Sequence, residues 1–332
     1  MKRGVVTGPW GVWKQPQRAR VRGHRAVMSN EKAIAPLRCS LDARPRPMPP
    51  PNSRPHHQPA PVWLRDWAGA WVFYSVLPPW PFIAPRFERI ARFAPLVGLV
   101  LGGLQALVWG LTAGWLPLAA QVALVLVLAV VLTGGLHLDG AMDTADGLGA
   151  GPRALEAMKD SRVGAAGVQA LLVVLLLRGA GLICLADGSP LAAALAAPLA
   201  MVWAAFWARA SPLLAMQYFP YLREQGSAGF HRQHWRGLAR ELRPVLGALL
   251  VLALLVGVLL ALGGVFVGDG LRLPQGVALG LWGALGVVPA VLVPLWLGRR
   301  LGGHSGDSYG ACVEWSEALA LLFMGLLLRA AG

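Results

Sequence analysis

Long apolar segments constrain the fold of this chain more than any other feature. After about residue 90, apolar stretches of roughly 20 residues alternate with shorter polar ones, and that length is what an α-helix needs to cross a bilayer. Of the 332 residues, 56% are hydrophobic and only 14% are charged, and the mean hydropathy is +0.54. The sequence therefore predicts an all-α fold, a polytopic membrane bundle of six or seven transmembrane helices.

The apolar pattern also gives approximate boundaries. An aromatic, amphipathic stretch at 62–77 is too short to span a bilayer and predicts an interfacial or re-entrant helix. Polar loops are expected at 136–163, 209–244 and 298–316. Transmembrane helices are expected at 93–115, 116–135, 164–186, 191–208, 245–267 and 276–297, with a last apolar helix ending near residue 328.

The N-terminal stretch differs from the rest in composition. Residues 1–61 are rich in Arg and Pro and lack apolar periodicity, so we expect a disordered basic arm ahead of a membrane domain at 62–332. Most of the net charge of +14 belongs to this arm, and the charge therefore does not predict a nucleic-acid partner. Three interpretations stay open: the arm does little, translation begins at Met28 or Met48 instead, or the arm lies on anionic lipid.

Arginine and lysine are unevenly distributed among the loops. The loops that follow the second, fourth and sixth predicted spans carry eleven Lys and Arg, six of them arginines in the loop at 209–244, whereas the loops after the first, third and fifth spans carry only Arg272. Under the positive-inside rule these loops and the N-terminus face the cytoplasm, with seven spans in total. We expect a multi-pass protein of the bacterial cytoplasmic (inner) membrane, with its active site on the cytoplasmic side.

The polar segment at 134–164 holds five of the chain's sixteen acidic residues. Asp139, Asp143 and Asp146 follow an i, i+4, i+7 spacing, which places them on one helical face within an arc of about 60°. Three such anions beside hydrocarbon repel one another, and a shared divalent cation explains them best. Mg²⁺ is the expected ion because it prefers carboxylates and substrate phosphates. Taken alone, Asp139 could equally be a helix N-cap.

Further polar residues surround this face. Lys159 and Arg162 flank Asp160 and could hold the charge of a phosphate, while His137 could contact substrate or simply lie at the interface. A glycine-rich stretch at 302–307 ends in Asp307, and Glu314 follows seven residues later. Its glycines are also explained by a plain cytoplasmic turn.

The motifs GGLHLDGAMDTADG and ALEAMKDSRVGAAG, together with RRLGGHSGDSYGACVEWSE near the C-terminus, resemble those of the cobalamin synthase family, the adenosylcobinamide-GDP ribazoletransferases. The likeness covers about residues 62–332. One small departure is Ala141-Met142, where Leu-Ala would be expected, and it changes no carboxylate.

The resemblance implies an Mg²⁺-dependent phosphotransferase in the last steps of cobalamin biosynthesis. Such an enzyme joins adenosylcobinamide phosphate, donated by adenosylcobinamide-GDP, to α-ribazole or its 5′-phosphate and releases GMP. Catalytic and metal-binding roles would fall to Asp139, Asp143, Asp146 and Asp160. Substrate-binding roles would fall to His137, Lys159, Arg162, Asp307 and Glu314. Contact with other corrinoid-pathway enzymes and the oligomeric state both stay open.

Two alternatives compete with this interpretation. The aspartate spacing is similar to that of the CDP-alcohol phosphotransferases, although Asp143-Thr144 replaces the Ala-Arg of their DGxxAR pattern. Intramembrane acids also occur in cation and proton transporters. A transporter predicts acids in the middle of spans and inverted repeats, whereas here the acids lie at span ends.

Overall fold

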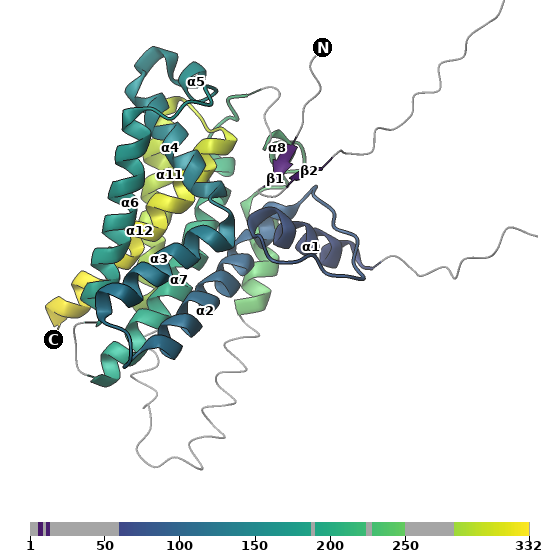
Figure 1. The fold of residues 1–332 in the computed structure, drawn as a ribbon. Coiled ribbons are helices and arrows are strands. Elements are labelled where there is room, and N and C mark those ends of the chain that lie inside the picture. Colours follow the sequence, from purple (N-terminus) through teal and green to yellow (C-terminus); the bar gives the residue numbers. More distant parts are fainter. Residues whose placement is uncertain are drawn as a thin grey trace, which may run out of the picture. The chain divides into compact units, whose positions relative to one another are not determined.

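The computed structural model of the protein describes residues 6–8, 11–13, 60–186, 190–223, 228–249 and 282–331. The first two of these ranges form strands β1 (Val6–Gly8) and β2 (Gly11–Trp13), which pair in a small sheet. The rest of the expected basic arm lies outside the described residues. From residue 60 onward the described chain is mostly helical (Figure 1), and residues 75–89 between α1 and η1 are a longer connection without a helix.

The helices follow one another in an order close to the one expected from hydropathy. They are α1 (Val62–Tyr74), α2 (Ala94–Thr112), α3 (Leu118–Thr133), α4 (Leu136–Gly149), α5 (Ala154–Ala157), α6 (Ala165–Ala186), α7 (Pro190–Tyr218), α8 (Gly229–Gln233), α11 (Val287–Leu301) and α12 (Gly306–Ala331). Short 3-10 helices η1 (Ile90–Phe93), η2 (Gly151–Arg153) and η3 (Ala284–Gly286) precede α2, α5 and α11, and residues 238–249 are also helical.

Five helices in the described part of the chain are long and apolar enough to cross a membrane, or six if the bent pair α3–α4 counts as one span. This confirms the predicted all-α membrane bundle. The count is below the seven spans expected, in part because most of the predicted span at 245–267 lies outside the described residues.

Two predicted boundaries are wrong. Helix α7 continues ten residues past the predicted end at Ala208, so Arg209 lies inside a helix rather than in a loop. Helix α12 begins at Gly306, so most of the loop predicted at 298–316 is helical. In both helices the polar residues that interrupt the apolar pattern are buried in the bundle, where they bond to one another, and a fall in hydropathy therefore does not mark a helix end there.

Close helix packing holds the bundle together around α7. Gly98 and Gly102, one turn apart on α2, face the backbone of α7 near Ala205 and Met201, and a side chain at either glycine would collide with that backbone. Small residues at such spacing let membrane helices approach closely and gain van der Waals contact. The same close approach recurs where α6 meets α12, at Gly181 and Gly325.

A sharp bend separates α3 from α4. Gly134 and Gly135 both adopt the left-handed backbone conformation, with φ of 60° and 71°. Residues other than glycine rarely adopt this conformation. The two helices consequently meet at 92°. The bend turns the acidic segment away from the line of α3 and presents it as a separate helix, α4.

Candidate functional site

Helices α4 and α12 touch at two glycines, and this contact creates the site. A Cβ atom on Gly140 would lie 2.5 Å from the backbone oxygen of Asp307, and one on Gly310 would lie 2.9 Å from the backbone oxygen of His137. Neither position has room for a side chain. The two motifs, more than 160 residues apart in the sequence, are therefore held together by backbone contact.

Three carboxylates gather at this contact. Asp139 and Asp307 line the same cavity, and Asp143 lies within electrostatic range of both. Asp307 is paired with Arg223, whose Nη2 is 2.7 Å from its Oδ2. Among the described residues, the carboxylates of Asp139 and Asp143 have no hydrogen-bond or ion-pair partner. Two carboxylates without a partner suit a cation that also takes ligands from a bound substrate.

Asp146 has a different environment from the other two aspartates of its face. Its Oδ2 accepts a hydrogen bond from the backbone N–H of Gly164, and its Oδ1 accepts one from Gly167, each at 2.8 Å. Gly164 directly precedes α6 and Gly167 lies in its first turn, where the backbone N–H groups have no partner within the helix. The carboxylate of Asp146 thus caps α6 and fixes it against α4.

Arg223 connects the acidic group to the segment that follows α4. Its Nη2 donates to the backbone oxygen of Met158 at 3.0 Å and contacts Asp307. Its Nε is buried and has no partner among the described residues. Such an unpaired guanidinium N–H is a natural donor to a phosphate oxygen.

The remaining basic residues of that segment lie apart from the cavity. Asp160 is bonded to Arg162, with Arg162 Nη2 2.6 Å from Asp160 Oδ2, and this contact lowers the pKa of Asp160 to about 2. Lys159 is exposed. The structure therefore places Lys159, Asp160 and Arg162 on the surface, next to Met158, rather than among the three carboxylates.

The predicted metal site is only partly assembled. Within the described ranges, no three His, Cys, Asp or Glu side chains are grouped closely enough to hold a metal ion. The donor type nevertheless fits Mg²⁺, which is commonly held by one or two carboxylates together with substrate phosphates. Asp139 and Asp143 provide two such carboxylates with no competing partner.

The cavity that Asp139 and Asp307 share has a volume of about 190 Å³ and is lined by residues of α1, η1, α2, α4, α7, α8 and α12. The rings of Tyr74 and His137 stack at 6.1 Å with an interplanar angle of 19°, and the Tyr74 hydroxyl lies 3.5 Å from His231 Nε2. Burial lowers the pKa of His231 to about 3, so its ring is neutral at ordinary pH. The Nδ1 atoms of His137 and His231 are buried without a partner in the described structure. The cavity thus offers aromatic walls and unpaired ring nitrogens.

Glu314 does not reach this cavity. It lies in the interior of the bundle, where Arg178 Nη2 is 3.0 Å from Glu314 Oε2 and 3.4 Å from Glu317 Oε2. Arg209 Nη1 also bonds Glu317 Oε2, at 3.0 Å. Two arginines and two glutamates thus neutralise one another where isolated charges would be very costly. Arg178, which falls within the span predicted at 164–186, is thus paired inside the bundle instead of reaching out to the interface.

Several residues of the site were not predicted from the sequence. Arg223 was one of six loop arginines with nothing to distinguish it, and Arg209 belonged to the same group. Tyr74 and His231 come from segments 157 residues apart. Their positions in the folded structure distinguish them: Tyr74, Arg209 and His231 line one cavity, and Arg223 pairs with Asp307. No spacing rule within a single helix could have found them.

Comparison with known proteins gives consistent results. A model of the family described as cobalamin-5-phosphate synthase matches residues 66–325. The adenosylcobinamide-GDP ribazoletransferase of Prochlorococcus marinus (strain MIT 9303) is 54% identical over 276 residues, which are 82% of this chain and 99% of that protein. The protein of the same name from Thermosynechococcus vestitus (strain NIES-2133 / IAM M-273 / BP-1) is 40% identical over 79% of this chain and 96% of its own length. No solved structure matches the chain.

Proposed function

The chain belongs to the cobalamin-5-phosphate synthase family, and from this premise we propose that it is an adenosylcobinamide-GDP ribazoletransferase of cobalamin synthesis. It transfers adenosylcobinamide phosphate from adenosylcobinamide-GDP to α-ribazole or its 5′-phosphate and releases GMP. The observation that best supports a phosphoryl-transfer site is the pair of unpartnered carboxylates, Asp139 and Asp143, beside Asp307. The relatives' names favour neither a CDP-alcohol phosphotransferase nor a transporter.

The reaction forms one phosphorus–oxygen bond and breaks another. A ribose hydroxyl of the acceptor attacks the phosphorus attached to cobinamide, the bond to the bridging oxygen of the diphosphate breaks, and GMP leaves with that oxygen. The hydroxyl proton passes to a carboxylate at the rim of the cavity. Because little covalent chemistry falls to the protein, catalysis depends on positioning and on neutralising charge.

Asp139 and Asp143 would hold a Mg²⁺ ion together with the diphosphate oxygens. When bound, the ion stabilises the charge that develops on the transferring and leaving oxygens. Arg223, anchored by Met158 and Asp307, would direct its buried Nε–H at the same oxygens. Asp146 would contribute by fixing α4 against α6 instead of by binding the ion.

The cavity is suited to the planar base of the nucleoside acceptor. Tyr74 and His137 present stacked rings, and an aromatic ring gains from such walls. The unpaired ring nitrogens of His137 and His231 could meet the polar atoms of the ligand, and they would otherwise remain unsatisfied. Asp139 and Asp307 line the same cavity, so the ribose of an acceptor bound there would lie near the phosphoryl group.

The membrane placement follows from the same proposal. The helices indicate a multi-pass membrane protein, and we place it in the cytoplasmic (inner) membrane. Its active site would face the cytoplasm, where nucleotide-activated substrates are made, in agreement with the arginine-rich loops. α-Ribazole, the lipid bilayer and other corrinoid-pathway enzymes are its proposed partners.

A direct assay tests the function. The purified full-length protein is reconstituted in lipid vesicles with adenosylcobinamide-GDP, and the acceptors α-ribazole, its 5′-phosphate and no acceptor are compared. We expect acceptor-dependent release of GMP that stops when EDTA is added and resumes with excess Mg²⁺. Turnover of CDP-diacylglycerol with an alcohol, without turnover of adenosylcobinamide-GDP, would overturn the proposal.

A further inference from the structure

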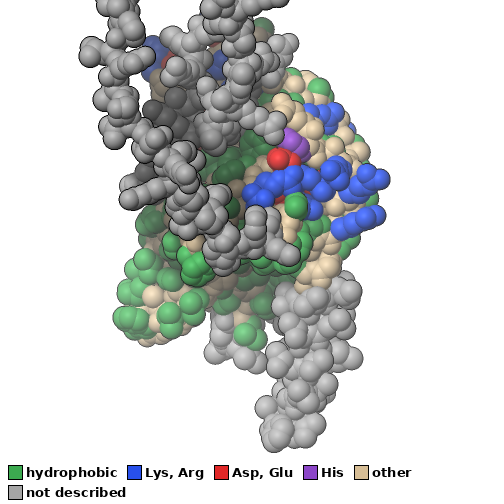
Figure 2. All heavy atoms as spheres, turned by 90° about the vertical axis from the view of Figure 1, so that its right-hand side faces the viewer, with side chains coloured by type: hydrophobic (Ala, Val, Ile, Leu, Met, Phe, Trp, Pro, Cys, Tyr) green, Lys and Arg blue, Asp and Glu red, His purple; other side chains and the backbone are tan. Residues whose placement is uncertain are grey.

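A second group of charged side chains lies outside the candidate site, beside η1. Two cavities of about 330 and 400 Å³ adjoin there and share Arg89 and Arg236. Six arginines line them in all, and none lines the site cavity described above: Arg86, Arg89, Arg92, Arg236, Arg240 and Arg243. Figure 2 shows Lys and Arg side chains gathered on one face around a few acidic atoms and a histidine. We call these six residues the arginine pocket.

Half of the arginine pocket is neutralised by ion pairs. Three carboxylates neutralise three of the six arginines, and two of these carboxylates, Asp66 and Glu241, are buried. The pairs are Arg86–Asp66, Arg86–Glu88, Arg92–Asp66 at 2.5 Å and Arg89–Glu241 at 2.7 Å. Asp66 thus fixes Arg86 and Arg92 to α1, and Glu241 fixes Arg89 to helical residues 238–249.

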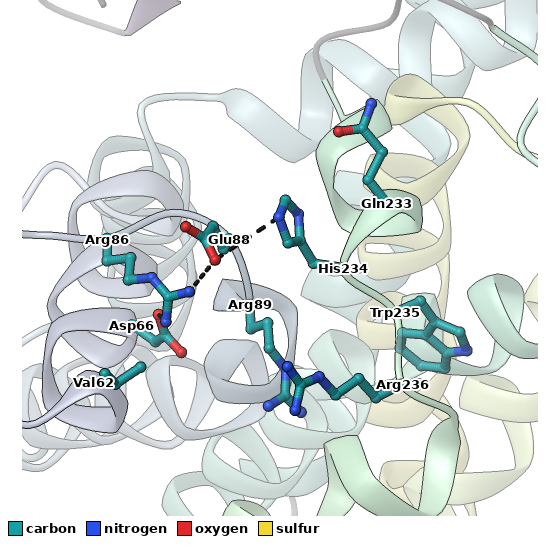
Figure 3. A pocket seen from close by; sticks show the side chains of 9 residues that line it. All are labelled: Val62, Asp66, Arg86, Glu88, Arg89, Gln233, His234, Trp235 and Arg236. Carbon is teal, nitrogen blue, oxygen red and sulfur yellow. Dashed lines mark hydrogen bonds and ion pairs between the residues drawn. The ribbon is translucent and has the colours of Figure 1, made fainter. Parts of the chain in front are cut away.

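The other half is not neutralised. Within the described part of the chain, Arg236, Arg240 and Arg243 have no acidic partner, and all three are exposed. In Figure 3 the side chains of Arg89 and Arg236 extend toward one another from opposite walls of the pocket. Three uncompensated positive charges around one hollow favour an anion with several oxygens, such as a phosphate, which arginine binds in a bidentate way.

The surroundings of the pocket distinguish between a soluble and a membrane-bound phosphate. Arg89 immediately precedes the membrane-spanning segment that begins at Ile90. Close to the pocket residues in the sequence, large apolar side chains are exposed, with Val62 and Trp63 55% and 52% accessible and Leu246 58% accessible. Arginines at a span end with exposed apolar and aromatic neighbours suit a lipid, whose headgroup phosphate and acyl chains require both.

We propose that the arginine pocket binds the headgroup phosphate of an anionic phospholipid through Arg236, Arg240 and Arg243. A bound lipid would also hold η1 in place, since Arg89 and Arg92 border the pocket while Ala91, between them, lines the site cavity. The lipid site would thus stabilise one wall of the candidate active site.

The proposal is tested by lipid binding to the full-length protein in detergent, measured by native mass spectrometry. The probes are phosphatidylglycerol, phosphatidylcholine and inorganic pyrophosphate. The variant R236Q/R240Q removes two of the unpaired charges, and R299Q/R300Q is the matched control because it removes two exposed arginines at the end of α11 that line neither cavity. We expect R236Q/R240Q to bind phosphatidylglycerol roughly 10- to 30-fold more weakly than the wild type, with the control within about twofold.

Three results would overturn the proposal. Equal weakening in both double variants would mean that lipid responds only to overall charge. Equal affinity of the wild type for phosphatidylcholine would remove the need for an anionic headgroup. Displacement of phosphatidylglycerol by equimolar pyrophosphate would assign the pocket to a soluble phosphate instead. The charge-preserving variant R236K/R240K checks folding, since it should retain most of the binding that R236Q/R240Q loses.

Discussion

Replacing Gly140 by alanine should separate the two halves of the site without removing any reactive group. The new Cβ atom would lie 2.5 Å from the backbone oxygen of Asp307, about 1 Å short of an ordinary van der Waals contact. Backbone cannot rotate away as a flexible side chain can, so α4 and α12 must move apart by nearly that amount. Overpacking of this kind typically costs about 1–3 kcal/mol of stability. A displacement of about 1 Å between catalytic groups can cost about 10²-fold in rate.

The assay is acceptor-dependent release of GMP from adenosylcobinamide-GDP by the reconstituted protein, with kcat and KM determined separately. Gly149→Ala is the matched control, because it adds the same methyl group to the same helix, where the nearest atom is an ordinary 3.6 Å away. We expect kcat of Gly140→Ala to fall about 10²-fold and that of Gly149→Ala to change less than about threefold. Thermal unfolding of both variants shows whether each is still folded at the assay temperature.

A Gly140→Ala protein with kcat within twofold of the wild type would refute the reasoning, since the helix contact would then not set the geometry of the site. Equal losses in the two alanine variants would also count against it. In that case helix α4 would tolerate no added methyl group anywhere, and the approach to Asp307 would have no special role.

Three further predictions concern individual side chains and the N-terminal arm. Asp139→Asn and Asp143→Asn should each lower kcat at least ~10³-fold at saturating Mg²⁺. Asp146→Asn keeps one of the two oxygen atoms that cap α6, so it should mainly lower the free energy of unfolding, by about 1–2 kcal/mol. Equal losses of rate in all three variants would instead make Asp146 an ion ligand. Arg223→Gln should raise KM for adenosylcobinamide-GDP about 10- to 100-fold, with partial recovery in Arg223→Lys, and an unchanged KM would exclude phosphate contact. A protein that begins at Met48 should insert and release GMP at a near-normal rate, because the resemblance to the family starts after the arm; lost turnover at unchanged protein level would show that the arm is needed.

How far the sequence alone predicts this structure depends on the range of the interaction involved. The i, i+4, i+7 spacing predicted a helix with three aspartates on one face, and α4 is that helix. The spacing says nothing about what lies opposite each residue, however. Asp146 meets the N-terminus of α6 while Asp139 borders the cavity. The shared face of the three aspartates could be predicted because it depends only on their spacing along one helix. Their different partners could not be predicted, because they depend on how the other helices pack against α4.

The two boundary errors have the same physical origin. A span was predicted to end where a charged residue interrupts the apolar stretch, because an isolated charge in hydrocarbon is energetically costly. Arg209 and Glu317 remove that cost because Arg209 Nη1 bonds Glu317 Oε2 at 3.0 Å. The two residues are 108 positions apart in the sequence and belong to different helices, α7 and α12. Neither residue signals in its own segment that it is paired. A span end is therefore predictable only where the polar residues have no partner elsewhere in the bundle.

The bend after α3 explains how a membrane enzyme can use acidic residues at all. Had α3 continued straight through Gly134 and Gly135, Asp139 and Asp143 would have extended the same helix axis and could not have met α12 at Gly140. The 92° bend instead lays α4 across the start of α12. Irregular backbone at membrane depth is tolerated where it is buried in protein or lines a polar cavity, and Leu136 and His137, which follow the bend directly, line the site cavity. The two consecutive left-handed glycines therefore do more than end a helix: they place Asp139 at the cavity and Asp143 within electrostatic range of Asp307.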